Sequence, residues 1–220
     1  MAIVFDLDGT LIDSVYQHVL AWREAMEAEG LELSAWRIHR RIGMSGGLMA
    51  RAILRETGRP VAAEDAERLQ RTHETCYGKQ IDSVRPLPGA HALLSHLSAR
   101  AVPWAIATSG RRATAEVAVE LLGLDRPPVL VTRDEVPHAK PDPDLFIAAA
   151  GRLGVDVADA IIVGDSVWDM LAAVRARSLG VGLLSGGAGE DELLRAGAMR
   201  VYDDPADLLS HLDEVGVRES

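Results

Sequence analysis

The chain has 220 residues, a mass of 23.6 kDa and a formal net charge of −10 at pH 7, so it is long enough to bury a sizeable core. The acidic excess, with no basic run to offset it, disfavours a nucleic acid or an anionic membrane surface as a partner. The longest apolar stretches, 101–107 and 160–164, are too short to span a bilayer, and the N-terminus carries no leader pattern. The single cysteine, Cys76, excludes an internal disulfide. We therefore expect a cytoplasmic protein, and small metabolites remain open as its partners.

The first predicted strand, residues 2–5, is an apolar run followed directly by two carboxylates, Asp6 and Asp8. Side chains alternate along a strand, so aspartates two positions apart can point the same way once Gly9 turns the chain. Carboxylates held this close need a neutralising cation, and Mg²⁺ is commonly bound by one or two carboxylates together with a substrate phosphate. The alternative is that Asp6 and Asp8 are turn or helix-cap residues.

The next part of the chain contains helical patterns only, at about 15–29, 34–41, 46–57 and 63–81. This insertion follows the first strand and ends at the turn-forming residues 86–89. In open α/β sheets, ligands bind in the crevice at the carboxyl ends of the strands. We therefore predict two domains: a core made of 1–14 and 83–220, and a helical cap domain, 15–82, that covers the crevice.

The second half of the chain alternates short apolar runs with helical patterns. Strands are predicted over 103–107, 128–131, 160–163, 180–184 and 199–202. Helices are predicted over 111–122, 142–153, 166–178 and 205–213. Such alternation indicates parallel βαβ units, so the predicted fold class is α/β, with a Rossmann-like parallel sheet and an inserted all-helical cap domain.

Thr108, Ser109 and Gly110 follow the predicted strand 103–107 and directly precede a helix. A hydroxyl and the backbone N–H groups at a helix N-terminus can hold a phosphate oxygen. The alternative is that Thr108 and Ser109 simply cap the helix.

Two further groups of polar residues lie at later strand ends. Lys140 is one of only two lysines in the chain, and it precedes a helix N-terminus, where the helix dipole does not favour a cation. The position of Lys140 therefore suggests that its side chain pairs with a separate group, such as an aspartate or a phosphate. Asp165 follows the strand 160–163 and could complete a metal site. Asp169 lies about one helical turn further on and, with Ser166, could orient a metal-bound water or Lys140.

Together these residues form four motifs: DxDGT at 6–10, a hydroxyl motif at 108–110, a lysine at 140 and GDxxxD at 164–169. With this order and spacing the sequence resembles the haloacid dehalogenase-like superfamily of phosphohydrolases over essentially its whole length, in the branch of the phosphoglycolate phosphatases and β-phosphoglucomutases. The resemblance implies that Asp6 is the nucleophile, which forms an aspartyl phosphate, and that Asp8 is the acid and base. It also implies that Thr108 and Lys140 hold phosphoryl oxygens, while Mg²⁺ is bound by Asp6, the Asp8 backbone carbonyl and Asp165.

The function implied by the resemblance is a Mg²⁺-dependent phosphatase of a small phosphorylated metabolite. The alternatives are a sugar phosphomutase and a non-catalytic binding protein. His18 stands where the phosphomutases carry a histidine at the cap hinge, but Ile42 and Gly46 replace the lysine and arginine with which mutases grip a second phosphate. Substrate contacts are predicted at Ser109, Gly110, His18, Arg41 and Ser45, the last two in the cap loop 40–47, whose alternative role is a simple interhelical turn.

Overall fold

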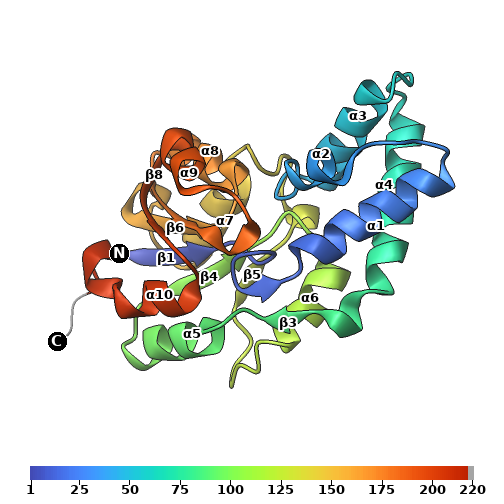
Figure 1. The fold of residues 1–220 in the computed structure, drawn as a ribbon. Helices are drawn as coiled ribbons and strands as arrows, with labels where there is room; N and C mark the ends of the chain where they lie inside the picture. The colour runs from blue at the N-terminus through green and yellow to red at the C-terminus, as the bar shows by residue number, and fades with distance from the viewer. Residues whose placement is uncertain (218–220) are drawn as a thin grey trace.

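The central feature of the computed structural model, which describes residues 1–217, is a six-stranded parallel sheet with β1 (Ala2–Phe5) in its interior (Figure 1). The strand order is β5-β4-β1-β6-β7-β8, and every adjacent pair is parallel. The other strands are β4 (Trp104–Ala107), β5 (Val129–Val131), β6 (Ala160–Gly164), β7 (Leu179–Leu183) and β8 (Ala198–Tyr202). The predicted α/β class and the five predicted later strands are confirmed, each within two residues at either end.

The order of the strands creates a switch point between β1 and β6. From β1 the chain continues to β4 and β5 on one side, whereas from β6 it continues to β7 and β8 on the other. Ile3 pairs with Ile161 and Phe5 with Val163, so the carboxyl ends of β1 and β6 lie level with each other. Open α/β sheets bind ligands at such a point, because the two connections leave a crevice between them.

Helices cover both faces of this sheet, and β1 contributes alternately to each. Val4 packs with α7 (Asp144–Arg152) and α8 (Val167–Ala176), whereas Ile3 and Phe5 pack in the cluster that includes α5, α6 and α10. Those three helices are α5 (Ala90–Ala99), α6 (Arg112–Glu120) and α10 (Pro205–Ser210), and α9 (Glu190–Ala196) lies against β7 and β8. Helices α5 and α9 are not among those predicted. Short 3₁₀ helices occupy Ile81–Ser83, Arg133–Glu135, Val157–Asp159, Leu184–Gly186 and Leu212–Val215.

A separate group of four helices lies beyond the carboxyl edge of the sheet, on the right in Figure 1. These are α1 (Val15–Ala28), α2 (Ala35–His39), α3 (Gly46–Glu56) and α4 (Ala63–Gly78). They have a core of their own, which includes Trp22, Met26, Ile53 and Leu69. The chain enters the group through β2 (Ile12–Asp13) and returns through β3 (Arg85–Pro86), and these two strands pair antiparallel. The two connections therefore lie side by side.

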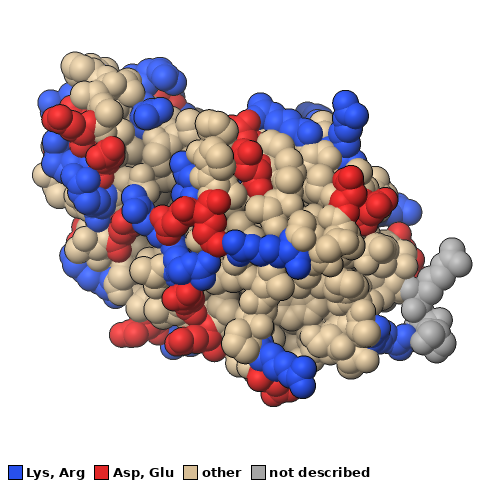
Figure 2. Space-filling view, turned by 180° about the vertical axis from the view of Figure 1, so that it is seen from behind, with Lys and Arg blue, Asp and Glu red and all other residues tan. Residues whose placement is uncertain are grey.

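The surface carries charged side chains of both signs. In the view of Figure 2 basic and acidic side chains lie intermixed. Many are in ion pairs, such as Arg152 with Glu135 and Arg175 with Asp142. Within residues 1–217, none of the helices combines the length and the apolar composition needed to cross a membrane.

Candidate functional site

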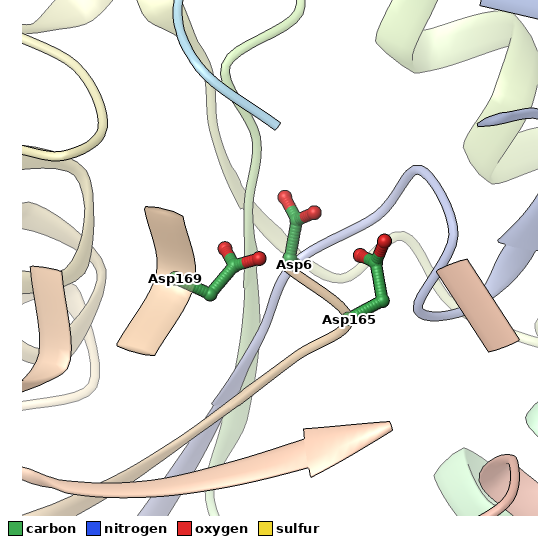
Figure 3. Close-up of side chains that lie close together, drawn as sticks. All are labelled: Asp6, Asp165 and Asp169. Carbon is green, nitrogen blue, oxygen red and sulfur yellow. The ribbon is translucent and has the colours of Figure 1, made fainter. Parts of the chain in front are cut away.

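Three aspartates meet at the switch point of the sheet. Asp6 directly follows β1, Asp165 directly follows β6, and Asp169 lies in the first turn of α8. All three are buried, and one carboxylate oxygen from each lies within 4.8 Å of the other two. Figure 3 shows the three carboxyl groups turned toward a common space. The arrangement arises because parallel strands deliver their following residues to the same edge of the sheet.

Lys140 is the cation of this cluster, and its side chain is fully buried. Its Nζ lies 2.5 Å from Asp6 Oδ1 and 2.8 Å from Asp169 Oδ1. Burial disfavours the charged amine, but the negative charges of Asp169 and Asp6 outweigh burial and raise the pKa of Lys140 above its ordinary value. The lysine is therefore a permanent positive charge beside Asp6.

Asp169 uses both of its carboxylate oxygens within the protein. Oδ1 accepts from Lys140, and Oδ2 accepts from the Ser166 hydroxyl at 2.5 Å and from the Ser166 backbone N–H at 3.1 Å. Ser166 is the N-cap of α8 and forms a capping box with Asp169. The first turn of α8 thus fixes Asp169, and Asp169 in turn holds Lys140.

The remaining carboxylates of the cluster lack sufficient positive charge. Burial raises the pKa of Asp6 to about 7; Lys140 opposes this shift, and the neighbouring Asp169 and Asp8 add to it. Burial, followed by repulsion from Asp169 and Asp6, also raises the pKa of Asp165 well above its usual range. Buried carboxyl groups of this kind favour binding of a cation, because a cation stabilises their ionised form. Asp6 and Asp165 therefore fit a divalent metal ion that prefers oxygen ligands.

Two glycines leave room for the Asp165 carboxylate. A Cβ added at Gly186 would lie 1.7 Å from Asp165 Oδ2, and one at Gly9 would lie 2.4 Å from the same atom. Gly9 also has a φ of +85°, which side chains rarely adopt. The Thr10 hydroxyl donates to Asp165 Oδ1 at 2.9 Å. Sequence analysis identified Gly9 as a turn residue but did not identify Gly186, which lies 177 positions away from it in the chain.

Asp8 lies apart from the three clustered carboxylates and has its own partners. Its Oδ1 accepts from the Ser14 hydroxyl at 2.7 Å and lies 3.2 Å from His18 Nε2, and the Thr108 hydroxyl is 3.5 Å from Oδ2. Burial alone would raise the pKa of Asp8, but the His18 charge, the His18 hydrogen bond and the Ser14 hydrogen bond together lower it. In the protein alone, Asp8 therefore ionises more readily than Asp6.

Sequence analysis missed His73, which contacts His18 from the other side. His73 Nε2 lies 3.2 Å from His18 Nδ1, and its ring stacks on Trp22 at 4.1 Å between centroids. The His18 ring stacks on Tyr77 at 3.8 Å. Burial and the neighbouring His18 hold the pKa of His73 well below its usual range, so His73 is a neutral imidazole. His18 is thus fixed between Asp8, His73 and Tyr77.

The hydroxyl motif forms the side of the site next to Asp8. The Gly110 backbone N–H donates to Thr108 Oγ1 at 2.9 Å, and the Ser109 hydroxyl donates to the Gly43 carbonyl oxygen at 3.3 Å. Helix α6 begins at Arg112 and has Arg111 as its N-cap. The alternative that Thr108 and Ser109 cap this helix is therefore wrong.

One pocket joins these groups to the helical segment. It is lined at the sheet edge by Asp6, Asp8, Thr108, Ser109, Gly110 and Lys140, and on the helical side by His18, Trp22, residues 41–44, Gly46, Met49, Gln70, His73, Glu74 and Tyr77, with Arg111 and Thr114 beside them. Of the predicted cap contacts, Arg41 lines this pocket. Ser45 lies in an adjoining hollow, and its backbone N–H donates to the Lys140 carbonyl oxygen at 3.3 Å.

The helical side of the pocket is dominated by α4, which sequence analysis did not connect with the site. Gln70, His73, Glu74 and Tyr77 follow the spacing i, i+3, i+4 and i+7, so they share one face of the helix. Their spacing is visible in the sequence. Their approach to Asp8 is not, because it depends on how α4 packs against α1.

The fold and the site geometry agree with a comparison with known protein families. A model of the haloacid dehalogenase-like hydrolases matches residues 1–177. The chain therefore belongs to the haloacid dehalogenase-like hydrolase family.

Individual relatives include enzymes named for different substrates. The chain is 34% identical to hexitol phosphatase A of Escherichia coli over 176 residues, which cover 79% of this chain and 78% of that protein. It is 33% identical to a phosphoglycolate phosphatase of Rhodospirillum rubrum over 214 residues, which cover 94% and 88%. Among solved structures, a hydrolase from Pseudomonas syringae is 52% identical, with a TM-score of 0.94 over 97% of this chain and 98% of that one.

Proposed function

We propose that the protein is a Mg²⁺-dependent phosphatase that hydrolyses a small phosphorylated metabolite in the cytoplasm. The observation that carries this proposal is the pairing of Asp6 with the buried Lys140, 2.5 Å apart, at the switch point of the sheet. A carboxylate can attack an anionic phosphate only where positive charge offsets the repulsion between them. The names of relatives such as hexitol phosphatase A and phosphoglycolate phosphatase support the same chemistry.

In the proposed mechanism Asp6 is the nucleophile. One of its carboxylate oxygens forms a bond to phosphorus while the bond from phosphorus to the leaving oxygen breaks, and Asp8 gives a proton to that leaving oxygen. The negative charge of a bound phosphate favours the protonated form of Asp8 and so opposes the lowered pKa that Asp8 has in the protein alone. Asp8 then accepts a proton from a water that attacks phosphorus, and the bond between phosphorus and Asp6 breaks to release phosphate. Thr108 and Lys140 hold the phosphoryl oxygens, and Asp169 and Ser166 keep Lys140 in place.

The carboxylates of Asp6 and Asp165, together with the Asp8 backbone carbonyl, would hold Mg²⁺. When bound, the ion supplies positive charge to the phosphoryl oxygens and orients them. Within the protein, the raised pKa values of Asp6 and Asp165 support this assignment, because burial and neighbouring carboxylates disfavour their ionised forms and a bound cation would offset both effects.

We further propose that residues 15–82 act as a cap that excludes water during phosphoryl transfer. Contacts between the segment and the core include His39 Nε2 with the Gly186 carbonyl oxygen at 2.9 Å, Arg40 with Glu192, the Ser109 hydroxyl with the Gly43 carbonyl oxygen, and Glu74 with Arg111. The paired strands β2 and β3 are the connections about which such a cap would move.

A phosphate-release assay tests the proposed function. Phosphorylated metabolites are incubated with the protein with and without Mg²⁺, and inorganic phosphate is measured. We expect release that requires Mg²⁺ from at least one ester. If sugar 1-phosphates are instead isomerised in the presence of a bisphosphate, the protein is a phosphomutase. The phosphomutase is less favoured because Ile42 and Gly46 offer no charge for a second phosphate.

Gly186→Ala is expected to weaken Mg²⁺ binding. Its added methyl group would overlap Asp165 Oδ2 at 1.7 Å, so the carboxylate must move away from the proposed ion. We expect the Mg²⁺ concentration for half-maximal activity to rise by at least about tenfold, the usual scale for disturbing a ligand's surroundings. Gly189→Ala is the matched control, since a Cβ there has open space. An unchanged Mg²⁺ requirement in Gly186→Ala would contradict the assignment of Asp165.

A further inference from the structure

The pocket has two chemically different ends. The role assigned to each end rests on the proposed phosphatase function. With phosphorus next to Asp6, the rest of the substrate must extend away from the sheet edge. The opposite wall is the face of α4 that carries Gln70, His73 and Glu74. That wall therefore contacts the leaving group.

The cations near that wall are already paired with carboxylates. Arg111 Nε lies 2.7 Å from Glu74 Oε1. Arg41 is paired with Glu56 and donates to the Arg37 carbonyl oxygen. Each of the two described arginines that line this pocket, Arg41 and Arg111, therefore already has a carboxylate partner that offsets its charge.

Glu74 also places a negative charge in the wall itself. Its Oε1 accepts from Gln70 Nε2 at 3.0 Å as well as facing Arg111, so two partners hold the carboxylate in position. A leaving group whose carboxylate approaches Arg111 Nε also comes close to Glu74, and like charges at short range repel. A hydroxyl group, by contrast, can donate a hydrogen bond to Glu74.

The neighbouring side chains also suit hydroxyl groups. Gln70 uses its amide nitrogen on Glu74, which leaves its carbonyl oxygen as an acceptor. His73 uses Nε2 toward His18, which leaves Nδ1. A hydroxyl can pair with Nδ1 in either tautomer of the ring, because it both donates and accepts.

We propose that the pocket accepts phosphate monoesters of neutral polyhydroxylated alcohols, such as polyols or sugars, and that Glu74 sets this preference against leaving groups that carry a carboxylate or a second phosphate. Specificity is a difference in binding free energy between two substrates, and a fixed charge of the same sign as one substrate is an effective means of rejecting that substrate.

Two matched pairs of esters test the proposal. Glucitol 6-phosphate and 6-phosphogluconate differ only in a hydroxymethyl group against a carboxylate, and glycerol 3-phosphate and 3-phosphoglycerate differ in the same way. We expect kcat/KM to favour the neutral member of at least one pair by about tenfold or more, which corresponds to a difference of about 1.4 kcal/mol. In Glu74→Gln this ratio should fall at least about fivefold, because Arg111 is released to bind the carboxylate.

Glu67→Gln is the control. Glu67 lies on the same helix with 69% of its side chain exposed, so its substitution should leave the ratio unchanged. A wild-type ratio at or below one, or a ratio that does not change in Glu74→Gln, would overturn the proposal. So would an equal loss for both members of a pair, since that indicates only a weakened contact between α4 and the core. The compound p-nitrophenyl phosphate serves as a third substrate. Hydrolysis of this compound without hydrolysis of either neutral ester would also overturn the inference about the leaving group. If no ester releases phosphate in a Mg²⁺-dependent manner, the proposed phosphatase function is wrong instead.

Discussion

Asp6→Asn is expected to lower the rate of phosphate release by more than about 10⁴-fold, the scale on which removal of an essential nucleophile acts. The amide is nearly the same size as the carboxylate, so the pocket should keep its shape while it loses the attacking oxygen. The measurement is kcat with saturating Mg²⁺ on the best ester found. Asp8→Asn should also abolish turnover, because the amide can neither give a proton to the leaving oxygen nor accept one from water.

Asp125→Asn is the matched control for both substitutions. Asp125 is exposed and lies between α6 and β5, at the opposite edge of the sheet. We expect its kcat to equal that of the wild type. Turnover at the wild-type rate in Asp6→Asn would show that another group attacks phosphorus, and the proposed mechanism would then be wrong.

Lys140→Met is expected to lower the free energy of unfolding by about 3–5 kcal/mol at pH 7, in addition to removing activity. Methionine has a similar length and no charge. Its introduction leaves Asp6 and Asp169 buried without the cation that lies 2.5 and 2.8 Å from them. Chemical denaturation followed by circular dichroism measures the difference from the wild type.

The loss of unfolding free energy in Lys140→Met should depend on pH. Burial already raises the pKa of Asp6 to about 7, and without Lys140 to oppose it the pKa should rise further. A carboxyl group whose pKa is raised on folding destabilises the native state progressively as the pH rises from its unfolded pKa to its folded pKa. For Asp6 this loss ends near pH 7 in the wild type, whereas in Lys140→Met it continues to higher pH. The deficit should therefore be larger at pH 8 than at pH 5.

The chain offers one matched control, because its only other lysine, Lys79, lies on the surface. Lys79 Nζ is 2.7 Å from Glu24 with both side chains well exposed, and such pairs contribute little to stability. Lys79→Met should change the unfolding midpoint very little at either pH. An equally small effect in Lys140→Met would contradict the view that Lys140 neutralises the buried carboxylates.

Much of the core could be predicted from sequence because its strands are short apolar runs with polar residues at their ends. Asp6, Thr108, Lys140 and Asp165 were predicted to meet on that basis, since parallel strands bring their carboxyl ends to one edge. Helices α5 and α9 were not predicted, because a glycine precedes each of them, Gly89 and Gly189, and not the Ser, Asp or Pro that marks the start of a helix in sequence.

Most of the residues on the helical side of the pocket could not be predicted from the sequence. His73 and Glu74 lie on a helix whose composition is mainly polar, with no motif to mark them. Their partners are distant in sequence: His18 is 55 residues from His73, and Arg111 belongs to the core. Such contacts depend on how α4 packs on α1 and on the sheet edge, which local patterns do not determine. Gly186 was missed for the same reason, since only the fold brings it to Asp165.

In the proposed mechanism an Asp6 carboxylate oxygen is the nucleophile that bonds to phosphorus. The most direct test of this role is ¹⁹F NMR with beryllofluoride, an analogue of a transferred phosphoryl group. We expect protein-bound fluorine resonances when both beryllofluoride and Mg²⁺ are present. These resonances should be retained in Asp8→Asn and absent in Asp6→Asn. Bound resonances of wild-type intensity in Asp6→Asn would contradict the claim, because the analogue would then be attached to another residue.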